Sequence, residues 1–345
     1  MRTSLLLSLL LFIATMAQAQ PALAGDDGFW LGADISGATE LEARGHTLRN
    51  AAGEPREATA LMRELGLRAV RLRVWVNPRH GFSGTDDVVL MAQRAKAEGM
   101  AVMIDFHYSD HWADPGKQFI PAAWKAITCD EMRQALSTHT RDVLLAVRQT
   151  GADVRWVQVG NETTNGFLWP VGRVPDQMAQ YAALTDAGYA AVKEVFPQAQ
   201  VIVHLDCASD PKRYDLVFDG LQAHHARWDM IGLSVYPYWD MKDGRTRSWR
   251  QTVRLATRNI NRLWEKYHTP LMIVETGTEV SRPERGRRIM RAVIRSARRR
   301  THGHCKGVFY WAPELEGHYP LGAFRNGQPT AIMDAFTEAA KKNNR

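Results

Sequence analysis

Two glutamates that follow apolar stretches could form a pair of catalytic carboxyls. One stretch starts at Val157 and ends on Asn161-Glu162, and the other starts at Leu271 and ends on Glu275. Hydrolysis of a glycosidic bond needs one carboxyl that protonates the leaving oxygen and a second that attacks or stabilises the sugar carbon. The two acids therefore predict glycoside hydrolysis.

Either glutamate taken alone has a simpler interpretation. An acid just after a strand is often a first-turn residue of a helix, where the positive end of the helix dipole stabilises it. The amide of Asn161 before Glu162, and the repetition of the same strand-then-acid arrangement at Glu275, favour catalysis. Neither feature identifies a substrate.

The strands that would carry these acids belong to a regular alternation of strand-like and helix-like segments. The strand-like segments are residues 31–35, 69–74, 101–106, 154–159, 201–205, 230–235, 271–274 and 307–311. The helical patterns are residues 57–65, 88–98, 129–149, 175–195, 214–225, 248–267, 285–299 and 331–341. Eight such units without a linker predict the α/β class and a single (β/α)8 TIM barrel over residues 25–345. An open doubly wound sheet is the alternative, but no Gly-rich phosphate turn follows a strand.

A TIM barrel places its functional residues at the C-terminal ends of its strands. Residues there that suit a sugar are expected to bind substrate: His107, Asp110, Trp112, Asp114, Trp169, His204, Asp206, Trp239 and Trp311. Tryptophan faces stack on sugar rings, and carboxylates accept hydrogen bonds from hydroxyls. Each tryptophan alone could simply pack, but their accumulation favours carbohydrate. Nucleic acid is not expected, because the basic residues lie on a helix flank and not among these aromatics.

Two arginines are expected to point into the barrel. Arg71 and Arg73 alternate with aliphatic residues, so both lie on the inner face of one strand. Buried guanidinium groups need acids, and Glu162, Glu275 and Asp105 are available. An arginine beside Glu275 would hold that carboxyl ionised at neutral pH, and we therefore include both arginines in the catalytic site. A purely structural ion network is the alternative.

The first residues of the chain predict export. An apolar run over residues 5–14 is followed by Ala-x-Ala sites at 17–19 and 22–24, so residues 1–24 read as a cleaved signal peptide. We expect a secreted or periplasmic protein without membrane insertion, acting as a monomer. The three cysteines, Cys129, Cys207 and Cys305, allow at most one disulfide. The net charge of +7 is concentrated on an amphipathic helix at 285–299, which is interpreted as a solvated basic face.

Several segments together resemble glycoside hydrolase family 53, the arabinogalactan endo-β-1,4-galactanases. They are residues 105–118 (DFHYSDHWADPGKQ), 160–162 (GNE), 166–170 (GFLWP), 234–237 (SVYP), 274–276 (VET) and 309–311 (FYW). The resemblance extends from about Gly32 to Phe336. It implies retaining hydrolysis of β-1,4-galactan, with no cofactor.

The resemblance also implies roles for individual residues. Glu162 is the expected acid/base, Glu275 the nucleophile, Tyr236 a hydrogen-bond partner of Glu275, and Asn161 the residue that holds the sugar 2-hydroxyl. Glu162 must be protonated at first, and burial beside a negative Glu275 would raise its pKa.

Two segments depart from the family pattern. The loop over residues 276–283, where many bacterial relatives hold calcium, is short and has Glu279 as its only acid, so no metal is expected. After the last strand, Ala312-Pro313 stands where the family usually has Glu-Pro, which affects the expected chain-length preference.

Two other functions stay open at this point. A xylanase, mannanase or cellulase of the same clan would use the same two acids and differ only in its contacts with sugar hydroxyls. A barrel that binds glycans without cleaving them would need neither Glu162 nor Glu275 at these positions, which argues against it.

Overall fold

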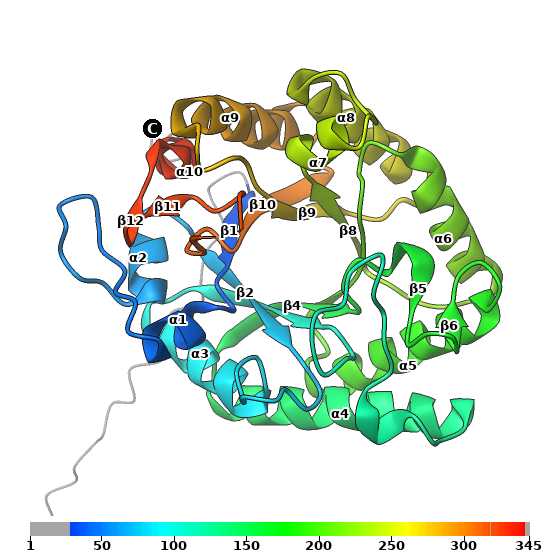
Figure 1. The fold of residues 1–345 in the computed structure, drawn as a ribbon. Coiled ribbons are helices and arrows are strands. Elements are labelled where there is room, and N and C mark those ends of the chain that lie inside the picture. Colours follow the sequence, from blue (N-terminus) through cyan, green and yellow to red (C-terminus); the bar gives the residue numbers. More distant parts are fainter. Residues whose placement is uncertain (1–27, 318, 342–345) are drawn as a thin grey trace, which may run out of the picture.

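Eight parallel strands close into a barrel inside a ring of helices in the computed structural model (Figure 1). The structure describes residues 28–317 and 319–341. The barrel strands are β1 (Trp30–Asp34), β2 (Ala69–Val74), β3 (Ala101–Phe106), β4 (Asp153–Val159), β7 (Gln200–Leu205), β8 (Met230–Val235), β9 (Leu271–Thr276) and β10 (Cys305–Trp311). Strand β1 pairs with both β2 and β10 and so closes the sheet. The predicted (β/α)8 barrel is confirmed.

The predicted helices also form, with bounds that differ from the predicted ones by at most three residues. They are α2 (Ala58–Glu64), α3 (Thr85–Ala97), α4 (Cys129–Gln149), α5 (Met178–Val195), α6 (Pro211–Ala223), α8 (Trp249–Tyr267), α9 (Pro283–Arg299) and α10 (Ala331–Lys341). Local signals set several of these bounds. Thr128 and Glu131 form a capping box at the start of α4, and Ser248 caps α8.

Short elements that the sequence did not predict lie in the connections between these units. They are α1 (Ala38–Ala43), α7 (Pro237–Lys242), the 3₁₀ turns η1 (Ala122–Trp124) and η2 (Thr163–Asn165), and the hairpins β5–β6 (Gly166–Phe167, Gly172–Arg173) and β11–β12 (Phe324–Arg325, Gln328–Pro329). Each is too short to show a periodic pattern of apolar residues.

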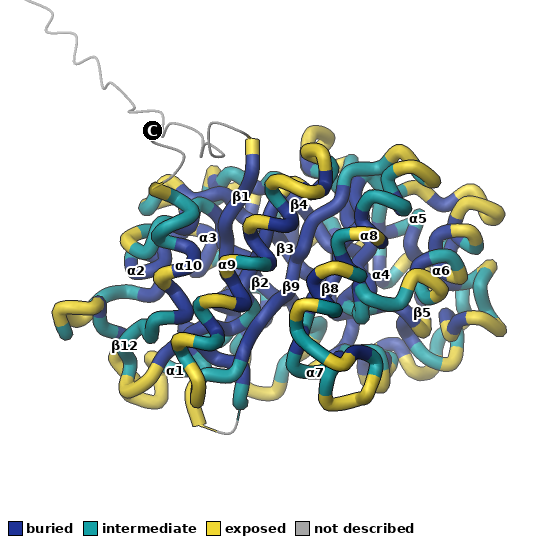
Figure 2. The backbone as a smooth tube through the Cα atoms, turned by 90° about the horizontal axis from the view of Figure 1, so that it is seen from above, coloured by how far each residue is buried: buried dark blue, intermediate teal, exposed yellow. Residues whose placement is uncertain are grey.

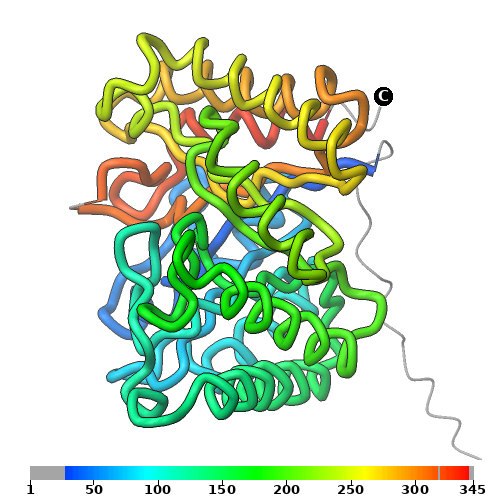
Figure 3. Tube along the Cα trace, turned by 90° about the vertical axis from the view of Figure 1, so that its right-hand side faces the viewer, coloured from blue at the N-terminus to red at the C-terminus, as the bar shows by residue number. Residues whose placement is uncertain are grey.

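The helices cover the barrel and leave the strands buried. Figure 2 shows the strands as the dark blue centre of the molecule and the exposed residues on its outer turns. Figure 3 shows the green and yellow helices of the middle of the chain as a continuous outer layer. On α9, Ile289, Val293 and Ile294 are buried, which confirms the predicted amphipathic helix.

Large apolar side chains fill the interior of the barrel toward the N-terminal ends of the strands. This inner cluster includes Trp30, Met103, Trp156, Met272 and Phe309. Gly32 is required beside it, because a Cβ atom at that position would lie 2.3 Å from a ring carbon of Phe309. The polar interior residues are therefore confined to the C-terminal half of the barrel.

The predicted signal peptide, residues 1–24, lies outside the described residues. Within residues 28–317 and 319–341, no helix has the length and apolar character needed to cross a membrane. The three cysteines are all free thiols.

Candidate active site

A cavity of about 570 Å³ opens at the C-terminal end of the barrel and contains both predicted catalytic glutamates. Its walls also contain most of the other predicted site residues: His107, Trp112, Asp114, Asn161, Asp206, Tyr236, Trp239 and Trp311. They come from loops far apart in the sequence, and the barrel brings them together because parallel strands end on the same side.

Glu162 enters the cavity from a sharp turn after β4. Its backbone is left-handed, with φ 45° and ψ 53°, two residues after Gly160 with φ 88°. A non-glycine residue in this region is uncommon and is concentrated at functional sites. The Ser234 hydroxyl donates a 2.6 Å hydrogen bond to Glu162 Oε1. Burial, then the negative charges of Glu275 and Asp206, raise the pKa of Glu162 well above its ordinary value.

Glu275 lies on β9 and is almost fully buried. Its Oε1 contacts Arg71 Nη2 at 2.9 Å, and its Oε2 accepts a 3.0 Å hydrogen bond from the Tyr236 hydroxyl. The contact between Tyr236 and Glu275 is the one that the sequence predicts. Within the described residues, Glu162 takes part in no ion pair, so the two carboxyls differ in their electrostatic surroundings.

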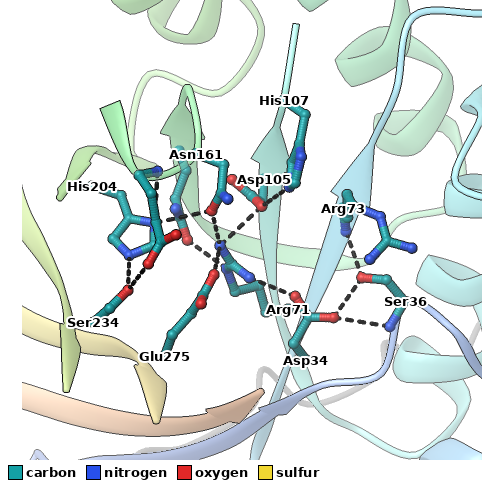
Figure 4. Close-up of polar contacts among 12 residues, drawn as sticks. Asp34, Ser36, Arg71, Arg73, Asp105, His107, Asn161, His204, Ser234 and Glu275 are labelled. Carbon is teal, nitrogen blue, oxygen red and sulfur yellow. Dashed lines mark hydrogen bonds and ion pairs between the residues drawn. The ribbon is translucent and has the colours of Figure 1, made fainter. Parts of the chain in front are cut away.

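Arg71 is the centre of a buried polar network (Figure 4). Its guanidinium contacts Asp34 at 2.6 Å, Asp105 at 2.9 Å and Glu275 at 2.9 Å. It also donates to Gln158 Oε1 at 2.6 Å and to Asn161 Oδ1 at 2.8 Å. The register of the sheet explains the first contact, because Asp34 of β1 pairs directly with Arg71 of β2.

An arginine lies beside Glu275 as the sequence predicts, but it is only one of several influences on the pKa of that carboxyl. Arg71 occupies the expected place and favours the carboxylate, but burial opposes it and Asp105 and Asp34 add further negative charge. Together these influences raise the pKa of Glu275 to about 7. For Asp105 the balance is reversed, because the Arg71 charge and His107 overcome burial and lower its pKa to about 2.

Arg73 points inward as predicted but binds aromatic rings instead of acids. Its guanidinium carbon lies 4.4 Å from the ring centre of Trp75 and 3.9 Å from that of Trp112, and its Nη2 donates to Ser83 Oγ at 2.9 Å. Trp112 is 40% exposed, and its ring lies 5.7 Å from that of Trp311. Arg73 therefore supports an aromatic wall of the cavity.

The two predicted histidines differ in their access to the cavity. His107 lines it, contacts Asp105 through Nε2 at 2.9 Å, and accepts a hydrogen bond from the backbone of Ala113. His204 is fully buried below the cavity, between Asn161 and Ser234. Any influence of His204 on a substrate must pass through these two neighbours.

Besides His204, two predicted substrate contacts lie outside this cavity. Asp110 and Trp169 line a second cavity of about 580 Å³ together with His111 and Phe119. The Asp110 carboxylate accepts hydrogen bonds from the backbone N–H groups of Asn77 at 3.1 Å and Ala122 at 2.8 Å. It thereby joins two loops.

Sequence reasoning missed several residues that shape the site. Asp34, Gln158 and Ser234 contact Arg71 or Glu162 directly. Gln158 and Ser234 are polar residues at inward positions of apolar strands, and this pattern indicates residues that face the site. Tyr319 lines the cavity and packs edge-on against Trp311 with ring centres 4.8 Å apart, but it lies in a loop with no periodic pattern.

The loop after β9 does not suit calcium. Calcium takes six to eight oxygen ligands, usually with several carboxylates. Here Glu279 is paired with Arg285 at 3.5 Å, and the loop leads into α9, whose N-terminal end adds positive partial charge. The described part of the chain contains no cluster of three or more His, Cys, Asp or Glu side chains that could hold a metal.

We expect a strong chelator to leave activity and melting temperature unchanged, because Arg285 beside Glu279 and the N-terminal end of α9 repel a divalent ion. Differential scanning fluorimetry with and without chelator measures this directly. A fall in melting temperature that calcium reverses and magnesium does not would contradict the expectation and direct attention to Glu314 and Glu316 after β10.

Comparisons with known proteins agree with this geometry. The family model described as "Glycosyl hydrolase family 53" matches residues 30–330. An uncharacterized protein of Niallia circulans is 34% identical over 258 residues, which are 73% of this chain and 68% of that protein. A probable arabinogalactan endo-β-1,4-galactanase A of Neosartorya fischeri is 31% identical over 259 residues, 73% of this chain and 70% of that protein.

A solved structure from a study of two fungal β-1,4-galactanases has the same fold. It superposes with a TM-score of 0.81 at 25% identity, and the alignment covers 91% of this chain and 100% of that one. The family match starts at the first residue of β1 and stops just before α10, so it includes every strand of the barrel. The chain therefore belongs to glycosyl hydrolase family 53.

Proposed function

We propose that this glycoside hydrolase cleaves β-1,4-galactosidic bonds within galactan, the backbone of type I arabinogalactan, with retention at the anomeric carbon. The observation that carries the proposal is the pair of buried carboxyls in one cavity, Glu275 held by Arg71 and Tyr236 and Glu162 held by Ser234. The names of the Neosartorya fischeri relative and of the fungal β-1,4-galactanases support galactan as the substrate.

The reaction proceeds by two displacements. A carboxylate oxygen of Glu275 attacks the anomeric carbon, the bond to the leaving oxygen breaks, and the proton of Glu162 passes to that oxygen. Glu162, now a carboxylate, then takes a proton from a water molecule whose oxygen attacks the same carbon. The ester bond to Glu275 breaks, and the two inversions give net retention.

The charges in the cavity suit this change of role. Burial and the negative charge of Glu275 raise the pKa of Glu162, which keeps the acid protonated at the start. When Glu275 becomes an ester, its charge disappears and the pKa of Glu162 falls, as a base requires. Asn161 Nδ2 donates one N–H to the backbone of Ala113 at 2.8 Å, and its second N–H is proposed to bind the sugar 2-hydroxyl.

The aromatic wall around the glutamates indicates attack within a chain. Trp112, Trp239, Trp311 and Tyr319 line the cavity and offer faces to successive sugar rings. We therefore expect early digestion of galactan to release oligosaccharides of several sizes, measured by chromatography over the first minutes. Release of monosaccharide alone would contradict the endo mode.

The same assay on xylan, mannan and cellulose tests the substrate. A preference for one of these polymers would assign the chain to a neighbouring specificity. Binding of galactan without cleavage of any polymer would indicate a non-catalytic glycan-binding barrel.

We further propose that the protein is exported and acts as a monomer. The basic and apolar start of the chain, followed by Ala-x-Ala sites, supports export. N-terminal sequencing of protein from the culture medium and from the periplasm, with size-exclusion chromatography, tests both points.

A further inference from the structure

A continuous series of polar contacts runs through the floor of the cavity from Glu275 to Ser234 (Figure 4), and Ser234 donates to Glu162. Its members are, in order, Glu275, Arg71, Asn161, His204, Ser234 and Glu162. Asn161 Oδ1 lies 2.8 Å from Arg71 Nη2 and 3.1 Å from His204 Nδ1. On the other side of the ring, His204 Nε2 lies 2.8 Å from Ser234 Oγ, which is 2.6 Å from Glu162 Oε1.

Elementary hydrogen-bond chemistry gives most of this series a direction. Arginine can only donate, so the atom of Asn161 that faces Arg71 must be the carbonyl oxygen. That oxygen can only accept, so the 3.1 Å contact with His204 requires a proton on Nδ1. Burial and the positive charge of Arg71 lower the pKa of His204 well below its ordinary value, so the ring is neutral. A neutral ring protonated on Nδ1 presents a bare Nε2 to Ser234.

A competing contact favours the other tautomer but is weaker. The backbone N–H of Glu162 lies 3.4 Å from His204 Nδ1 and would need that nitrogen to be bare. It is longer than the 3.1 Å contact to Asn161, and a bare Nδ1 would place two acceptor lone pairs against each other at that distance. The Nδ1-protonated ring therefore fits the site better.

Ser234 consequently has one hydroxyl proton and two acceptors. When Glu162 is protonated, its own O–H can donate to Ser234 Oγ while the Ser234 proton goes to His204 Nε2, and each contact then has one donor. When Glu162 is ionised, the same serine proton can turn to the carboxylate. The contact with His204 Nε2 then has no proton, and the stronger hydrogen bond to the charged carboxylate offsets that loss.

We propose that Ser234 is a positioning residue that switches its hydroxyl proton between His204 and Glu162 as Glu162 changes from acid to base. No proton leaves Ser234 or His204 in this switch, because only the hydroxyl rotates. The inference rests on the proposed function, in which Glu162 plays both roles.

The other charged and titratable groups around Glu162 do not stabilise its ionised form. The negative charges of Glu275 on β9, Asp206 after β7 and Asp114 after β3 all oppose its ionisation. The phenolic groups whose pKa values the charge of Glu162 raises are those of Tyr214 on α6, Tyr236 after β8 and Tyr319 after β10. Among the described residues, no lysine or arginine forms an ion pair with Glu162. Ser234 is thus a specific donor to the carboxylate among groups that disfavour it.

The test is Ser234→Ala, assayed on galactan and on an aryl β-1,4-galactobioside with a good leaving group. Loss of one hydrogen bond to a charged carboxylate should slow the base-catalysed second step about 10- to 100-fold. On the aryl substrate, kcat and KM should fall together while kcat/KM stays near that of the unmodified enzyme, because the first step needs little acid. On galactan, the alkaline limb of kcat/KM should move up by about one pH unit.

Two controls separate this role from a structural one. Ser234→Thr keeps the hydroxyl. It should therefore restore kcat and KM on the aryl substrate, and the pH profile on galactan, to those of the unmodified enzyme. Ser296→Ala removes a buried serine on α9, away from the cavity, and should change neither. An alanine variant with the unmodified pH profile, or with equal loss of kcat and kcat/KM on the aryl substrate, would overturn the proposal.

A measurement on the unmodified enzyme needs no substitution at the site. Nitrogen-15 spectra of histidine-labelled protein should show His204 as the Nδ1-protonated tautomer, and an Nε2-protonated ring would overturn the proposed direction of the series. The activity of the unmodified enzyme on galactan is the reference for all of these measurements. If that activity is absent, the proposed function fails, whereas an active enzyme with a normal alanine variant rejects only the role of Ser234.

Discussion

Replacing Glu275 by glutamine should lower kcat by several orders of magnitude on every substrate, because the nucleophile is lost. Glu162→Gln should have an equally large effect on galactan but should spare the first step on an aryl galactobioside, whose leaving group needs little protonation. In the Glu162→Gln variant the second step still lacks a base, so the ester between the sugar and Glu275 should accumulate. Mass spectrometry of the intact protein after rapid quenching should show the added glycosyl mass in the Glu162 variant only.

Three comparisons sharpen this experiment. Azide, which needs no base, should restore turnover of the aryl substrate to Glu162→Gln and not to Glu275→Gln. Glu279→Gln, in the loop after β9 and paired with Arg285, should keep the activity of the unmodified enzyme. If both active-site variants are equally inactive on the aryl substrate and neither carries a covalent adduct, the assignment of roles is wrong.

Replacing Arg71 by methionine should destabilise the protein more than any change at the surface. Arg71 is fully buried and faces the carboxylates of Asp34, Asp105 and Glu275. Its removal leaves buried negative charges unpaired, for which a loss of about 3–5 kcal/mol in the free energy of unfolding is expected. Arg227→Met, which breaks an exposed pair with Asp186, should cost less than about 1 kcal/mol.

The loss at Arg71 should depend on pH with a definite sign. In the unmodified protein the Arg71 charge and His107 overcome burial and lower the pKa of Asp105 to about 2, so Asp105 stabilises the fold above its ordinary pKa of 3.8. That contribution disappears as pH falls toward 2. Without Arg71, burial raises the pKa of Asp105 instead, and the unpaired carboxyl destabilises the fold at neutral pH. Urea denaturation should therefore show a large difference at pH 7 that shrinks below about pH 4.

Activity and stability should separate in a second variant. Arg71→Lys keeps the positive charge but cannot contact three acids and two amides at once, because an ammonium lacks the planar fork of guanidinium. It should recover part of the stability and little of the activity. A methionine variant as stable as Arg227→Met would show that the buried network contributes no net stabilisation.

Much of the fold could be predicted from the chain because its signals are local. Strands β2, β3 and β8 begin and end at the predicted residues, since each is a short, mostly apolar stretch between two helical patterns. Eight such runs alternating with helical patterns admit few architectures, and the barrel then requires that the residues after the strands meet. For this reason Glu162, Glu275 and Tyr236 could be placed in one site without coordinates.

What the sequence could not decide were the contacts that depend on register and burial. Alternation along β2 shows that Arg71 and Arg73 face inward, but only the pairing of neighbouring strands makes one bind three acids and the other two tryptophans. Burial, Arg71, Asp105 and Asp34 together set the pKa of Glu275. No single residue predicts whether that pKa is raised or lowered. Ser234 and His204 acquire their roles because β7 and β8 place them below Glu162. Side-chain periodicity is a property of one strand, whereas charge balance and hydrogen-bond direction belong to the closed barrel.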